Sequence, residues 1–122
     1  MKEARPAGPE LLVVVTTVGT QEQALDIANH LVENRLAACV NILPGVRSIF
    51  RWKGQVSDDT EYLLLVKTVR ERYDEVAAAI KALHAYELPE ILAHPATIAD
   101  AAFASWVVES TTPAEAQTRT RK

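Results

Sequence analysis

The sequence has little of several features that mark specialised classes of protein. Among its 122 residues there is one cysteine, which excludes an intramolecular disulfide and a CxxC pair for metal or redox chemistry. Four scattered glycines provide no Gly-rich loop to hold a phosphate. No apolar run approaches the ~20 residues of a membrane-spanning helix. The first ten residues lack the apolar segment of a secretory signal. A cytoplasmic protein without a membrane partner is therefore expected.

The sequence also has little excess of one sign of charge, since its net charge is −3. A mildly acidic chain lacks the basic surface that binds phosphate backbones, so no nucleic acid is expected as a partner. The length predicts a single domain, and 48% hydrophobic residues suffice for a core. We expect this domain to span residues 11–110, with flexible tails at 1–10 and 111–122 that carry few apolar residues.

The sequence does contain alternating strand and helix patterns. Apolar, β-branched or alternating segments predict strands at 11–18, 36–56, 61–68 and 88–98. Apolar residues at helical spacing predict helices at 20–35 and 68–84 and a short last helix capped by Asp100. Thr20 with Gln23, and Thr68 with Glu71, have the spacing of capping boxes.

The order of these elements is β-α-β-β-α-β plus a C-terminal helix. It predicts an α+β, ferredoxin-like split βαβ fold, in which an antiparallel sheet of four strands carries two helices on one face. Pro44-Gly45 fits either a hairpin turn or a bend within one long strand. Residues 54–59 are predicted to form the next turn. Since many unrelated functions use this fold, function must come from particular residues.

The stretch "LHAYELPEILA" at 83–93 concentrates chemically active side chains. It places His84, Tyr86, Glu87 and Glu90 between a helix and a strand. Imidazole with carboxylate ligands suits copper or zinc, which makes His84, Glu87 and Glu90 candidate metal ligands. A polar loop is the alternative, because a histidine at a helix C-terminus is favoured by the helix macrodipole alone.

The lone cysteine, Cys39, is the only candidate nucleophile of its kind. The segment "AACVNI" places no basic residue beside it in sequence, and a thiol needs such a neighbour to become a reactive thiolate. We therefore expect Cys39 to be buried and inert. A hydrolase that pairs Cys39 with His84 is the weaker alternative.

Four ordered motifs resemble those of the CutA-type divalent-cation tolerance proteins. They are "RLAACVNILPGVRSIFRWKGQV", "EYLLLVKT", "HAYELPEI" and "FASWV". The resemblance covers residue 11 to about residue 110. It implies a ferredoxin-like homotrimer that binds divalent cations, Cu(II) above all, without an enzymatic reaction or an organic cofactor. It also implies that the chain runs through Pro44-Gly45 as one long, bent strand.

The same resemblance bears on the candidate sites. Two positions that supply copper ligands in similar proteins hold Thr17 and Leu83 here, and Ala85 replaces a usual proline, which implies a weaker Cu(II) site. The trimer of the family resembles that of PII-type signalling proteins. The alternative function is thus a PII-like trimer that binds a small ligand or partner protein at clefts between subunits. Residues that match the family and are expected at these clefts are Cys39, Trp52, Glu61, Lys67, Tyr86 and Pro89.

Overall fold

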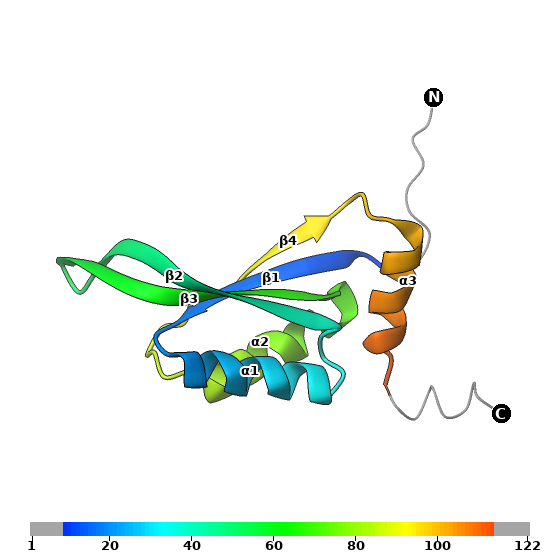
Figure 1. Ribbon diagram of the computed structural model, residues 1–122, viewed down its shortest axis with the longest axis horizontal. Helices are drawn as coiled ribbons and strands as arrows, with labels where there is room; N and C mark the ends of the chain where they lie inside the picture. Colours follow the sequence, from blue (N-terminus) through cyan, green and yellow to red (C-terminus); the bar gives the residue numbers. More distant parts are fainter. Residues whose placement is uncertain (1–8, 114–122) are drawn as a thin grey trace.

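The computed structural model describes residues 9–113, which form the expected α+β fold (Figure 1). The strands are β1 (Leu11–Val18), β2 (Cys39–Trp52), β3 (Gln55–Val69) and β4 (Leu92–Ala96). The helices are α1 (Gln21–Glu33), α2 (Tyr73–Leu83) and α3 (Ala101–Ser110), and a 3-10 turn (Arg70–Arg72) precedes α2. The strands lie in the order β2-β3-β1-β4, and all neighbours are antiparallel. The predicted ferredoxin-like arrangement is confirmed.

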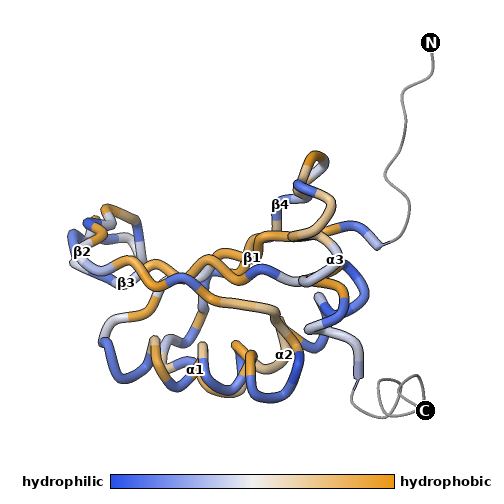
Figure 2. Tube along the Cα trace, turned by 45° about the vertical axis from the view of Figure 1, so that its right-hand side comes forward, coloured by the Kyte–Doolittle hydropathy of each residue, from blue (hydrophilic) through white to orange (hydrophobic). Residues whose placement is uncertain are grey.

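Helices α1 and α2 cover one face of the sheet (Figure 1). Val14 and Val66 of the sheet pack there against Ile27 of α1 and Ile80 of α2, all fully buried. Figure 2 shows apolar stretches on the strands and on the side of α1 that faces them. Because side chains alternate along a strand, the residues next to Val14 and Val66 point to the opposite face.

Among the described residues, the cover of that opposite face is limited to one end. Helix α3 packs there through Val107 against Leu11 and Val69. Beyond this contact the same face carries further apolar side chains that are half-buried or exposed. They are Val13, Val15, Leu43, Leu63, Leu65 and Leu92. We call these six residues the open face.

Two of the three helix starts predicted from side-chain caps are confirmed. The Oγ1 atom of Thr20 accepts a hydrogen bond from the Gln23 amide at 3.1 Å, which begins α1. The carboxylate of Asp100 accepts one from the Phe103 amide at 3.0 Å, which begins α3. Each cap satisfies an amide that has no partner inside its helix.

Strands β2 and β3 form one long hairpin that extends away from the helices (Figure 1). Strand β2 runs through Pro44-Gly45 with a bulge between Leu43 and Val46, so the bent strand is confirmed. The predicted turn at 54–59 is wrong, because β3 already begins at Gln55. The connection is only Lys53-Gly54, both with positive φ (51° and 81°). Two such residues match the twist of the flanking strands.

Two other predicted details are wrong because of contacts between elements that are distant in the sequence. Thr68 does not cap α2: its hydroxyl is buried and donates to the Leu36 carbonyl at 2.7 Å. The last strand is Leu92–Ala96 rather than 88–98, and it passes through Pro95. Proline is tolerated there because β4 lies at the edge of the sheet.

The expected tails lie mostly outside the described residues. Just before β1, the Glu10 carbonyl accepts a hydrogen bond from the Arg70 amide at 2.9 Å. Just after α3, Thr111 is buried, and its hydroxyl donates to the Val107 carbonyl at 2.9 Å. Residues 10 and 111 therefore both contact the domain, and the flexibility of the expected tails stays a prediction.

Candidate functional site

His84 stands at the C-terminal end of α2, and both of its ring nitrogens are hydrogen-bonded within the chain. Its Nε2 lies 2.7 Å from the Thr17 carbonyl, and its Nδ1 lies 3.1 Å from the Tyr86 amide nitrogen. A carbonyl can only accept and an amide N–H can only donate, so the ring carries its proton on Nε2 and is neutral. In this arrangement neither nitrogen offers a lone pair to a metal ion.

Gln23 holds the same loop from α1. Its Nε2 donates to the Leu83 carbonyl at 3.0 Å, and its Oε1 accepts from the Ala85 amide at 2.6 Å. The sequence assigned Gln23 to a capping box, but its side chain turns away from its own helix start and closes the end of α2. No local pattern signals this role, because the partners are about 60 residues apart.

Tyr86 reaches from this loop to a buried carboxylate. Its hydroxyl donates to Oε2 of Glu61 at 2.6 Å, and Glu61 is only 5% exposed. Burial, the hydrogen bond to Glu61 and the negative charges of Glu61 and Asp59 all raise the pKa of Tyr86 well above its usual range. Gly19 permits the close approach, since a Cβ at this position would lie 3.2 Å from the phenol oxygen.

The rings of His84 and Tyr86 lie against each other, with centroids 4.7 Å apart and planes tilted by 44°. Together with Gln23 and Glu61 they form a network that fixes the loop between α2 and β4. We call these four residues the loop anchor. It joins the segment after α2 to α1 and β3, and His84 also contacts Thr17 of β1. The sequence predicted two of its members, His84 and Tyr86, as neighbours in one site.

The three predicted metal ligands do not form a metal site within one chain. Glu87 is exposed and pairs with Lys53 of the hairpin, with Nζ 3.4 Å from the carboxylate oxygen. Glu90 is also exposed. Residues 9–113 contain no cluster of three or more His, Cys, Asp or Glu side chains that could hold a metal ion. A site with His84, Glu87 and Glu90 therefore stays a prediction that needs donors from elsewhere.

The predicted cleft residues lie in three parts of the chain. Trp52 is at the hairpin tip, where the Lys53 ammonium stands 5.5 Å from the ring centroid. Glu61 and Tyr86 belong to the loop anchor, and half-buried Pro89 follows in the same loop. The remaining pair, Cys39 and Lys67, sits on neighbouring strands near α3. That these residues meet at a cleft between subunits stays a prediction, because the structure contains one chain.

The prediction that Cys39 is buried is wrong, whereas its inertness stays a prediction. Its side chain is half-buried, and its direct cross-strand partner is Lys67. The Lys67 ammonium donates to the side-chain oxygen of Asn41, which occupies the next position on the same face of β2. The neighbour was invisible in sequence because strand pairing brings it across 28 residues of chain.

Comparison with known proteins decides the family. The model of the family described as "CutA1 divalent ion tolerance protein" matches residues 12–110, nearly the whole of the described fold. The chain belongs to this CutA1 family. The resemblance seen in the sequence motifs is thereby confirmed.

Individual relatives agree with this assignment. A divalent-cation tolerance protein CutA of Thermus thermophilus is 48% identical over 99 residues, which cover 81% of this chain and 96% of the relative. The chloroplastic protein CutA of Arabidopsis thaliana is 37% identical over 111 residues, 91% of this chain but 60% of the relative. A solved CutA1 from Oryza sativa has a TM-score of 0.82 at 36% identity, covering 85% of this chain and 95% of the other.

The names of relatives in this family give different subcellular locations. The Arabidopsis protein is called chloroplastic. A solved CutA from Archaeoglobus fulgidus, 37% identical with a TM-score of 0.81 and 84% and 99% coverage, is called periplasmic. Within residues 9–113 of this chain no helix is long and apolar enough to cross a membrane.

Proposed function

We propose that this CutA1 protein is a cytoplasmic homotrimer that binds divalent cations, Cu(II) foremost, and contributes to metal tolerance without catalysing a reaction. The family assignment supports the link to divalent cations. Assembly, the identity of the metal and the cellular location are the further steps of the proposal.

The observation that carries the proposal is the open face. Its leucine and valine side chains extend past the end of the sheet that α3 covers. Leu43 is 40% exposed and Leu92 is 53% exposed, although both lie in strands. Contiguous apolar surface of this kind marks an interface between proteins. Strands β2 and β4 also present two sheet edges to which other chains can pair.

A shared metal site is consistent with the arrangement of donors. Glu87 and Glu90 are exposed carboxylates on the loop after α2, and a second copy can add oxygen or nitrogen donors to them. His84 joins such a site only if its ring releases the Thr17 carbonyl or the Tyr86 amide. Among divalent first-row metals, the general order of affinity puts Cu(II) first.

The separation of Cys39 and His84 argues against the weaker alternative, a hydrolase that pairs these two residues. His84 contacts Thr17, whereas Cys39 pairs with Lys67, which in turn pairs with Val13. Val13 and Thr17 are four residues apart in β1, or about 13 Å along the strand. A thiol and a base so far apart cannot exchange a proton directly.

Isothermal titration with Cu(II), Zn(II) and a panel of nucleotides tests this proposal against the PII-like alternative. Saturable binding of Cu(II), tighter than that of Zn(II), and no response to nucleotides is the expected result. The double change Glu87→Gln and Glu90→Gln should weaken Cu(II) binding by about tenfold or more, on the order of 1.4 kcal/mol. Glu71→Gln, an exposed carboxylate before α2, is the matched control. Binding of a nucleotide without any binding of Cu(II) would favour the alternative.

A further inference from the structure

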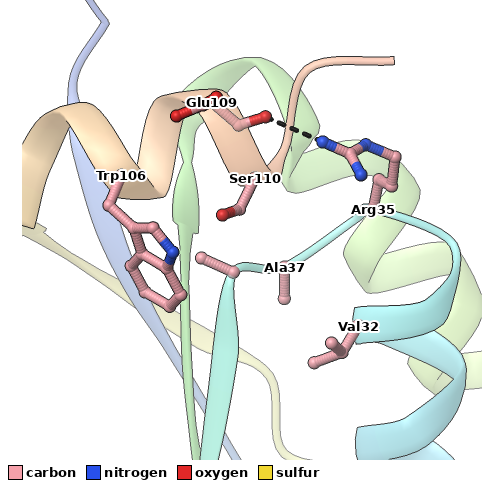
Figure 3. A pocket seen from close by; sticks show the side chains of 7 residues that line it. Val32, Arg35, Ala37, Trp106, Glu109 and Ser110 are labelled. Carbon is pink, nitrogen blue, oxygen red and sulfur yellow. Dashed lines mark hydrogen bonds between the residues drawn. The ribbon is translucent and has the colours of Figure 1, made fainter. Parts of the chain in front are cut away.

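We propose that a pocket between α1, the start of β2 and α3 binds a small aromatic carboxylate. The pocket has a volume of about 400 Å³ and lies next to the C-terminal ends of α1 and α3 (Figure 3). That volume is at the small end of the range for ligand sites and suits a molecule of one or two rings. The proposal is independent of the proposed metal site, because the pocket uses none of His84, Glu87 and Glu90.

Apolar side chains, one of them aromatic, line part of the pocket beside polar ones. The Trp106 indole hangs from α3 on one side, and Val32 of α1 lies on the other (Figure 3). Ala37, only 1% exposed, lies between them, and its small side chain leaves the space open. Phe103 packs on Trp106 with ring centroids 5.7 Å apart, which helps to fix the indole. A flat wall opposite an aliphatic one suits an aromatic ring.

Hydrogen-bond donors are concentrated among the polar side chains of the pocket. Arg35 carries a positive φ of 59°, and its side chain crosses to α3. Its Nε donates to the Thr112 carbonyl at 2.8 Å, and its Nη2 donates to the Glu109 carbonyl at 2.9 Å. These bonds fix a positive charge at the rim. The Trp106 indole N–H and the Ser110 hydroxyl add two further donors.

This donor set predicts the charge of the ligand. Arg35 is the cation of the lining, and guanidinium groups favour carboxylate partners. The carboxylate of Glu109 is drawn on the other side of the α3 ribbon from Ala37 and Val32 (Figure 3). An acceptor group with negative charge, attached to an aromatic ring, therefore fits the pocket better than a cation or an alcohol.

The probe for the test is 2-naphthoate, with EDTA present so that no metal contributes. Trp52→Phe leaves Trp106 as the only tryptophan, since the chain has two. Nuclear magnetic resonance of a ¹⁵N-labelled sample then gives one indole N–H signal that reports on the pocket. We expect this signal to shift and saturate with one 2-naphthoate per chain. The neutral analogue 2-naphthylmethanol should bind at least about fivefold more weakly, because it lacks the charge that pairs with Arg35.

A pair of opposite charges at Val32 makes the test specific. Val32 is 41% exposed, so a polar replacement should leave the fold intact, which thermal unfolding will check. Val32→Glu should weaken 2-naphthoate by about tenfold through like-charge repulsion, whereas Val32→Lys should preserve or strengthen binding. An indole signal that does not shift would overturn the proposal. A neighbouring copy that fills the pocket would give this result. Equal binding of the two probes, or equal loss in both variants, would also overturn it.

Discussion

At the scale of single residues, the hydrogen bond between Tyr86 and Glu61 is the contact with the clearest energetic consequence. Tyr86→Phe removes the donor and leaves the carboxylate of a 5% exposed residue without it. We expect a loss of about 1–3 kcal/mol of unfolding free energy, measured by urea denaturation at neutral pH. Tyr73→Phe, at a tyrosine that is half-buried, is the control and should cost less. Equal losses in both variants would contradict the assignment.

The same substitution has a signature in alkaline solution. The pKa of Tyr86 is raised on folding, so the folded protein keeps the phenol proton to higher pH than the unfolded chain. The stabilisation is complete below the unfolded pKa of about 10 and is lost as pH rises above it. Unfolding free energy should thus fall more steeply above about pH 10 in the parent protein than in Tyr86→Phe.

Gln23 is the other residue of the loop anchor that can be tested alone. Gln23→Ala removes both hydrogen bonds to the backbone around His84. We expect faster hydrogen exchange at the Ala85 amide and a loss of about 1–3 kcal/mol of unfolding free energy. Gln21→Ala, exposed in the same helical turn, should change neither quantity. Unchanged exchange at Ala85 would remove Gln23 from the anchor.

Sequence reasoning at this scale found residues but not their partners. It singled out His84 and Tyr86 because several reactive side chains crowd a short stretch of chain. It missed that His84 uses both nitrogens internally, because the Thr17 carbonyl lies 67 residues away. It missed the basic neighbour of Cys39 for the same reason, since Lys67 becomes a neighbour only through strand pairing.

At the scale of elements, the β2-β3 hairpin depends on two residues with positive φ. Gly54→Ala should destabilise the protein by about 1 kcal/mol, because a Cβ is unfavourable at φ 81°. Lys53→Asn should stabilise it by a few tenths of a kcal/mol, because asparagine tolerates this conformation better than lysine. Urea denaturation of both variants checks the pair. Changes of the same sign would show that the turn does not govern the hairpin.

Elements were more predictable than contacts. The apolar, β-branched run 11–18 matched β1 completely, since a strand buried by neighbours on both sides needs such residues. The hairpin turn was misplaced because Ser57, Asp58 and Asp59 are polar and look like loop residues. All three lie in β3, where Asp58 and Asp59 are exposed and Asp58 pairs with Arg47 across the hairpin at 2.7 Å. Polarity reports exposure, and an exposed strand is as polar as a turn.

At the scale of the whole molecule, the open face and the outer surface of α1 each expose a leucine to a similar extent, but we expect an interface only on the open face. Leu43→Glu places a charge on this face, and Leu25→Glu places one on α1, where the leucine is 43% exposed against 40% for Leu43. We expect sedimentation velocity to find a trimer for Leu25→Glu and smaller species for Leu43→Glu. A charge cannot be buried in an apolar interface without a partner. A trimer that tolerates Leu43→Glu as well would place the interface elsewhere.

We propose that copies of this chain assemble as a trimer that binds Cu(II). Native mass spectrometry of the full chain during a Cu(II) titration measures both properties in one spectrum. We expect a species of three chains that gains copper ions in a saturable way, with less retention of Zn(II) under the same conditions. A monomer, or a trimer that acquires no copper beyond the adducts of an unrelated protein, would contradict the account.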